Sequence, residues 1–160
     1  MRVIGYRGVS VVSHLIKFQT RSHYSHVAIE LTDGTVIEAW QTGGVRRIDD
    51  AFIDHSPKTV IDAYRVSAYF DETAVENYLY NCIGQKYDFS SVFRFITRRH
   101  AIDNTKKFCS ELVELAFKEG GCQLLNGNPS EHSPRDTLLS PHLIFEETLL
   151  DPRLIHEGTQ

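Results

Sequence analysis

Cys109 has both the residue type and the position of a nucleophile. It lies at the start of an amphipathic segment, FCSELVELAF at 108–117, which directly follows the polar and basic stretch 104–107. This pattern predicts a helix that begins beside the cysteine. In the first turn of a helix, unpaired backbone N–H groups and the positive end of the helix dipole favour a thiolate over a thiol. The alternative is a buried, inert thiol, because Cys109 shares a helical face with apolar residues.

His26 is the candidate base. It lies in the segment YSHVAIEL at 24–31, where Val27, Ile29 and Leu31 alternate with other residues. Alternation with a period of two predicts a strand that is buried on one face and displays His26 on the other. A histidine held there in one orientation could accept the proton of a thiol, although a strand histidine can also be a surface residue or a hydrogen-bonded one.

Glu38 could orient this histidine, depending on how the chain turns. The residues TDGT at 32–35 are a strong hairpin signal, and a second strand containing Glu38 follows them. A two-residue loop would place Glu38 on the face opposite His26. A three-residue loop, with Gly34 in the left-handed conformation, would place Glu38 opposite Ala28 and on the same face as His26. We expect the three-residue loop, because it gives the carboxylate a diagonal route to the imidazole.

These three residues together have the logic of a cysteine hydrolase. Cys109 would be the nucleophile, His26 the base and Glu38 the group that orients the imidazole. Each residue type means little by itself, but all three occupy positions that aim side chains into one possible cleft. The combination predicts cleavage of an amide bond, in a peptide or an amino-acid amide, through an acyl-enzyme.

Six short motifs follow one another along the chain. They are SHVAIEL at 25–31, GTVIEAW at 34–40, GGV at 43–45, IGQKYD at 83–88, FCSELV at 108–113 and SPRD at 133–136. In this order they resemble the circularly permuted NlpC-type papain-like amidases, the YiiX-like group. In that group the histidine strand and its polar partner precede the cysteine helix, whereas ordinary papain-like enzymes begin with the cysteine.

The resemblance covers about residues 5–142 and implies an α+β domain with a permuted papain-like fold. In that fold the cysteine helix packs against an antiparallel sheet that carries the histidine. The resemblance implies the roles given above for Cys109, His26 and Glu38. Tyr87 matches a tyrosine near the nucleophile of NlpC-type enzymes, which implies contact with the substrate or the oxyanion; otherwise Tyr87 is a turn residue packed on the core. The backbone N–H of Cys109 is another expected oxyanion donor.

Two other functions stay open at this point. The related lecithin:retinol acyltransferase group uses the same chain order on fatty acyl substrates, which makes lipid acyl transfer or thioester cleavage an alternative. The aromatic run at 89–96 could line an acyl pocket, although such spacing is more often core. The second alternative is a non-catalytic binding module that keeps the cleft.

Length and charge describe the expected domain and its partners. The chain has 160 residues, enough for one compact core. We expect a catalytic domain at 1–145 and a C-terminal tail at 146–160 that is loosely packed or partly disordered. The net charge of −4 argues against nucleic-acid binding. A local basic stretch at 94–107 could attract an anionic substrate or a phospholipid head group, but lipid or membrane binding is not indicated, and the oligomeric state is open.

The cysteines and histidines indicate neither a disulfide framework nor a metal site. There are three cysteines without paired spacing, and the N-terminal segment has no apolar run long enough for a signal peptide or a membrane span. We therefore expect a cytoplasmic protein. His23 and His26 would lie on opposite faces of a strand, so we expect no bound metal, and no other cofactor is indicated.

The remaining signals describe scaffold. Ser10 could cap a short helix at 11–16, and Asp71 a second helix that stops at Gly84. The alternation at 59–66 predicts a third strand. The Gly120-Gly121 pair is expected to end the cysteine helix.

Overall fold

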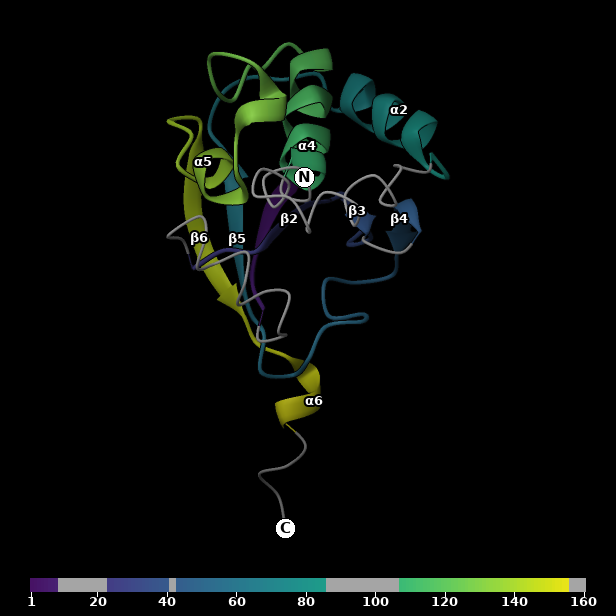
Figure 1. Ribbon diagram of the computed structural model, residues 1–160. Helices are drawn as coiled ribbons and strands as arrows, with labels where there is room; N and C mark the ends of the chain where they lie inside the picture. The colour runs from purple at the N-terminus through teal and green to yellow at the C-terminus, as the bar shows by residue number, and fades with distance from the viewer. Residues whose placement is uncertain (9–22, 41–42, 86–106, 156–160) are drawn as a thin grey trace, which may run out of the picture.

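An antiparallel sheet is the framework of the protein (Figure 1). The computed structural model describes residues 1–8, 23–40, 43–85 and 107–155. In these residues the strands are β1 (Arg2–Arg7), β2 (His26–Glu30), β3 (Val36–Trp40), β4 (Gly44–Ile48), β5 (Val60–Val66) and β6 (Leu143–Leu149). Their order across the sheet is β4-β3-β2-β1-β5-β6, and all neighbouring pairs are antiparallel. The predicted antiparallel sheet is confirmed.

Two helices, α2 (Glu72–Cys82) and α4 (Lys107–Glu119), cover one face of the sheet (Figure 1). Helix α4 packs against β2 and β3 and against α2. The alternating apolar residues of the strands point toward the helices, where their burial provides the main driving force for folding. This core includes Val27, Ile29, Ile37, Leu79, Leu112, Val113 and Phe117, all at most 2% exposed.

The opposite face of the sheet is also buried. Tyr6, Ala28 and Glu38 lie on it and are 0% exposed. The loop at 49–59, between β4 and β5, folds back over this face and buries Ala51 there. Our expectation that β2 is buried on one face only is therefore wrong. The alternation in β2 could not reveal a covering segment that comes from elsewhere in the chain.

The β2–β3 hairpin has the three-residue loop expected from the sequence. Ile29 pairs with Ile37 across the two strands. This register places Ala28 opposite Glu38, so that His26 and Glu38 lie on the same face of the sheet.

The predicted second helix and third strand are present as α2 and β5. The Asp71 side chain caps α2 and accepts a hydrogen bond from the backbone N–H of Ala74 at 3.1 Å. Gly84, with φ of +81°, follows the end of the helix. The helix predicted at 11–16 lies outside the described residues.

Helix α4 ends at Glu119, just before the Gly120-Gly121 pair, as the sequence predicted. Gly121 has φ of +83°, and the N–H of Cys122 donates to the carbonyl of Phe117 at 2.8 Å, which satisfies an otherwise unpaired carbonyl at the helix end. Two short helices follow and pack near α4: η1 (Pro129–Glu131) and α5 (Pro134–Leu138). No helix within the described residues has the length and apolar character needed to cross a membrane.

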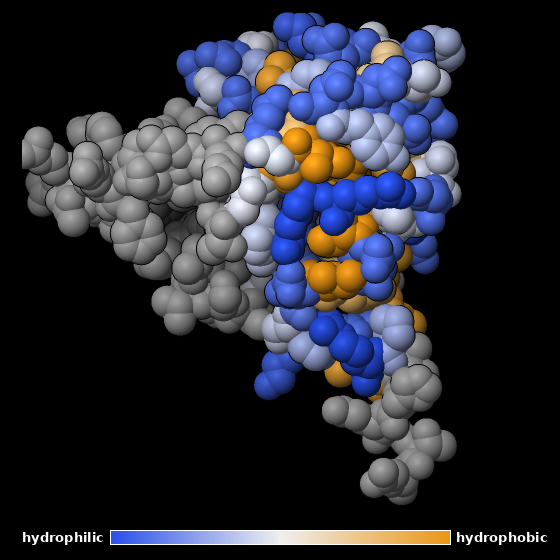
Figure 2. Space-filling view, turned by 90° about the vertical axis from the view of Figure 1, so that its right-hand side faces the viewer, coloured by the Kyte–Doolittle hydropathy of each residue, from blue (hydrophilic) through white to orange (hydrophobic). Residues whose placement is uncertain are grey.

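Three strands, β1, β4 and β6, were not predicted from the sequence. β1 lies between β2 and β5 and is buried on both faces, so its apolar residues do not alternate with polar ones. β4 is an edge strand with two arginines. Part of its free edge is covered, because the N–H of Gly84 donates to the carbonyl of Val45 at 2.9 Å. On this side of the molecule, hydrophobic side chains lie exposed between hydrophilic ones (Figure 2).

The C-terminal region is more ordered than expected. We placed the domain boundary at 145, but β6 continues through Leu149 and pairs with β5, so the expectation of a loose tail is wrong for its first residues. Most side chains of β6 are exposed. Its order comes from backbone hydrogen bonds and polar contacts, such as the 2.6 Å hydrogen bond from Thr148 Oγ1 to Asp62 Oδ1, which hydropathy does not reveal. Helix α6 (Pro152–Ile155) follows.

Gly34 provides a test of the hairpin loop. It has φ of +85° and open space around the position of a Cβ atom, so Gly34→Ala should introduce backbone strain without a clash. We expect a loss of about 1 kcal/mol in the free energy of unfolding, measured by urea denaturation. Gly43→Ala is the matched control, because Gly43 also has open space but no left-handed φ. Equal stabilities of the two variants would contradict the left-handed loop.

Candidate active site

Cys109 meets His26 at the end of the sheet. Cys109 lies in the first turn of α4, and His26 is the first residue of β2, so the imidazole lies where the strand begins. Cys109 is close enough to His26 to help raise the pKa of the imidazole. The thiol therefore approaches from the helix side and the imidazole from the start of the strand, as expected for a nucleophile and its base.

Glu38 holds the other side of the imidazole. Its Oε2 lies 2.7 Å from His26 Nε2, and the Glu38 side chain is 0% exposed. Because Nε2 is engaged by Glu38, Nδ1 is the ring nitrogen left for Cys109. A carboxylate that accepts the Nε2–H fixes both the tautomer and the orientation of the ring.

Arg46 is a member of the site that the sequence analysis missed. Its Nε and Nη2 lie 3.0 and 2.7 Å from Glu38 Oε1. Its guanidinium also stacks on Trp40, with Cζ 4.2 Å from the ring centroid. Arg46 is the direct cross-strand partner of Glu38 in the β3–β4 pair. The pairing of these two strands, had it been predicted, would have revealed this contact.

The charges of the site stabilise each other. Burial lowers the pKa of His26, but hydrogen bonds and charge interactions with Cys109 and Glu38 outweigh it and raise that pKa to about 10. Burial likewise opposes ionisation of Glu38, but His26, His55 and Arg46 outweigh it and hold the pKa of the Glu38 carboxyl well below its usual range. An ionised carboxylate beside an imidazolium is therefore the stable state of the pair.

A second buried carboxylate anchors α4. Glu114, 3% exposed, lies 2.7 Å from His132 Nδ1 and accepts a 2.7 Å hydrogen bond from Thr137 Oγ1. Ser110, next to the candidate nucleophile, donates to the carbonyl of His132 at 2.7 Å. These contacts fix the helix that carries Cys109 against η1 and α5.

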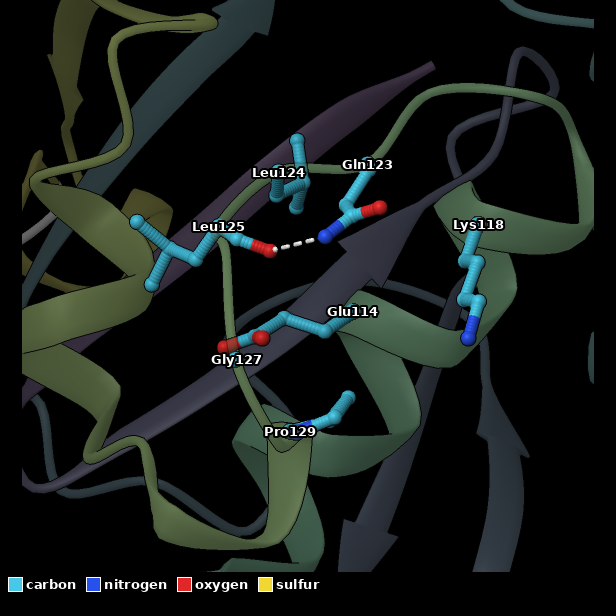
Figure 3. Close-up of a pocket in the computed structure, with 7 residues that line it drawn as sticks. All are labelled: Glu114, Lys118, Gln123, Leu124, Leu125, Gly127 and Pro129. Carbon is cyan, nitrogen blue, oxygen red and sulfur yellow. Dashed lines mark hydrogen bonds between the residues drawn. The ribbon is translucent and has the colours of Figure 1, made fainter.

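A small pocket beside α4 is separate from the candidate site. In Figure 3, Glu114 reaches from α4 toward the segment between Gln123 and Pro129, and Gln123 Nε2 donates to the carbonyl of Leu125 at 3.0 Å. The pocket has room for about one water molecule. Cys109 does not line it, so the pocket offers no substrate site for the thiol.

Several predicted features lie outside the described residues. They are Tyr87, the aromatic run at 89–96 and most of the basic stretch at 94–107. His23 is described and is exposed. Across the described ranges, no three His, Cys, Asp or Glu side chains are arranged to hold a metal ion.

Comparison with known proteins supports the fold. No family model matches the chain. No curated protein matches it either. Among solved structures, it is similar to the metalloprotein YiiX from Escherichia coli O157:H7, of the DUF1105 family, with a TM-score of 0.66. The fold is similar to that of YiiX.

The likeness to YiiX covers 94% of this chain and 97% of YiiX, at 19% sequence identity. It agrees with the YiiX-like part of the resemblance seen in the sequence. At this identity it supports the fold alone. The relation to papain-like amidases and to the lecithin:retinol acyltransferase group stays a prediction, and the roles of individual residues are argued from geometry.

The three cysteines offer a test of thiol activation. Cys109, Cys82 and Cys122 are 5%, 4% and 4% exposed, so the reagent has similar access to all three. Burial raises the pKa of Cys82 and of Cys122. We expect iodoacetamide at neutral pH, followed by peptide mapping, to label Cys109 fastest. The control His26→Gln should slow labelling of Cys109 only, and equal rates at all three cysteines would contradict the assignment.

Proposed function

We propose that this protein is a cysteine hydrolase of permuted papain-like fold that cleaves an amide bond through an acyl-enzyme. The observation that carries the proposal is the chain of contacts from Cys109 in the first turn of α4, through His26, to the buried Glu38. A thiol at a helix start, a hydrogen-bonded imidazole and a carboxylate behind it are the parts that nucleophilic catalysis requires.

The reaction would begin from a Cys109 thiolate and a His26 imidazolium. The thiolate sulfur attacks the carbonyl carbon of the amide, and negative charge develops on the oxygen near the backbone N–H of Cys109. His26 Nδ1–H then donates its proton to the leaving nitrogen, the C–N bond breaks and a thioester remains. Water attacks the thioester while His26 accepts its proton, and the acid leaves as the thiolate forms again.

Glu38 contributes to both halves of this cycle. It accepts the Nε2–H of His26 throughout, so the ring presents Nδ1 to the thiol and the leaving group. Its negative charge also stabilises the imidazolium that exists before attack and after water is deprotonated.

The comparison with a metalloprotein raises the question of a metal in this site. The described residues do not fit one. Arg46 occupies Oε1 of Glu38 with two nitrogens, and its positive charge would repel a cation at that carboxylate. We therefore assign no step to a metal, and the proposed chemistry uses groups of the chain itself and water.

The experiment that tests the proposal is capture of an acyl-enzyme. We expect 4-nitrophenyl acetate to acetylate Cys109, detected by mass spectrometry of the intact protein and of its peptides, and Cys109→Ala to remain unmodified there. Aminoacyl and dipeptidyl 4-nitroanilides should then be hydrolysed, whereas release only from fatty acyl esters would favour the lipid alternative. Absence of any acylation at Cys109 would leave the binding-module alternative.

Glu38→Gln should lower turnover but less than Cys109→Ala does. We expect a loss of roughly 10- to 100-fold, because an amide can hold the ring but lacks the charge that stabilises the imidazolium. Activity should rise with pH as the thiolate–imidazolium pair forms and fall as the imidazolium loses its proton.

The pH profile of the Glu38→Gln variant has a defined sign. Glu38 is one of the groups that raise the pKa of His26 to about 10, so its removal should move the alkaline limb to lower pH. An unchanged alkaline limb, measured on the best 4-nitroanilide, would show that Glu38 does not act through His26.

A further inference from the structure

A second imidazole lies against the Glu38 carboxylate. His55 Nε2 is 3.9 Å from Glu38 Oε2, beyond hydrogen-bond distance. The His55 ring stacks on Tyr6, with centroids 4.2 Å apart and planes 16° apart, and meets the edge of Trp40 at 5.4 Å. The contacts with Tyr6 and Trp40 fix the orientation of the His55 ring and therefore the direction of its Nε2 atom.

The backbone around His55 is arranged to bring this ring inward. Asp54, the residue before it, has φ of +61°, a left-handed conformation that is uncommon for residues other than glycine. Asp54 Oδ2 accepts a 2.7 Å hydrogen bond from Arg46 Nη1, and Arg153 Nη2 donates to the carbonyls of Phe52 and His55 at 3.3 and 3.0 Å. Hydrogen bonds from Arg46 and Arg153 thus hold the loop on both sides of the turn that places His55 in the site.

The Nε2 atom of His55 is buried and has no hydrogen-bond partner. A buried polar atom without a partner costs about 1–3 kcal/mol, so a phenylalanine stacked on Tyr6 would serve the fold at least as well. Glu38 Oε2, which receives one hydrogen bond, from His26, lies 3.9 Å from this nitrogen. The placement indicates a role for the nitrogen at the site.

We propose that His55 is a positioning residue of the proposed thiol hydrolase: it directs its Nε2 atom toward Oε2 of Glu38 and keeps that carboxylate against His26. The inference rests on the proposed function. The imidazolium of His26 stabilises the thiolate of Cys109, so a carboxylate held in place favours the reactive pair. The titratable or charged groups that face Glu38 and His55 are Tyr6 from β1, His26 from β2, Arg46 from β4 and Asp54 from the loop.

Two substitutions separate the nitrogen of His55 from its ring. His55→Phe keeps the stacking surface and removes the nitrogen, whereas His55→Gln keeps an N–H donor and removes the ring. We expect His55→Phe to slow alkylation of Cys109 by iodoacetamide about 10-fold at pH 7 and to move the midpoint of its pH profile upward. His55→Gln should stay within about 3-fold of the parent. His142→Phe, which changes a histidine outside this site, should leave the rate unchanged.

Two further readouts distinguish positioning from packing. The melting temperature of His55→Phe should change little, because a phenylalanine ring can still stack on Tyr6 and the nitrogen that is lost makes no hydrogen bond. In a double-mutant cycle, His55→Phe should have no further effect on alkylation in a Glu38→Gln background, since His55 acts through the charged carboxylate. Additive effects of the two substitutions, or a slow His55→Gln with a normal His55→Phe, would overturn the inference.

The His26 ring gives a readout that does not depend on the thiol. NMR titration should show a lower pKa of His26 in His55→Phe than in the parent protein, because the carboxylate that stabilises the imidazolium is less well held. An unchanged pKa of His26 in this variant would overturn the proposed role of His55. A higher pKa would also overturn it, because it would show that His55 acts as a cation that competes with His26 for the carboxylate. Slow labelling of Cys109 in the parent would instead refute the proposed hydrolase.

Discussion

The structure depends on one buried negative charge, the carboxylate of Glu38. An isolated carboxylate removed from water is strongly destabilising, so a fold can bury it only by surrounding it with donors and positive charge. Here Arg46 serves one oxygen and His26 the other. The loop at 49–59 can therefore close over this face of the sheet, and the same contacts that permit its burial also orient the imidazole beside Cys109.

The candidate pair of His26 and Glu38 was accessible from sequence because it depends on local rules. Alternation assigned the faces of two neighbouring strands, and a glycine in the hairpin selected the register between them. Helix α4 was predictable for a similar reason, since its apolar stripe and its glycine stop lie within one continuous segment. Patterns within about fifteen residues of each other were thus sufficient for these parts.

Other parts depend on contacts that no short pattern contains. His55 follows a turn at Asp54 with a positive φ, and an aspartate permits this conformation without specifying it. β1 is buried on both faces by segments from elsewhere in the chain, and β6 is ordered by pairing with β5 and not by its own hydropathy. In each case the determining neighbour is distant in sequence, and the local residue types are compatible with several structures.

Arg46 distributes its guanidinium between two tasks. Nε and Nη2 bind Glu38, while Nη1 binds Asp54 in the loop that carries His55. A lysine would preserve the charge, but a single ammonium cannot reproduce a two-nitrogen contact with one carboxylate while also reaching a second. Arg46→Lys, a substitution usually regarded as conservative, would thus disconnect the covering loop from the carboxylate beneath it. The geometry of the guanidinium, more than its charge, determines which residue this position tolerates.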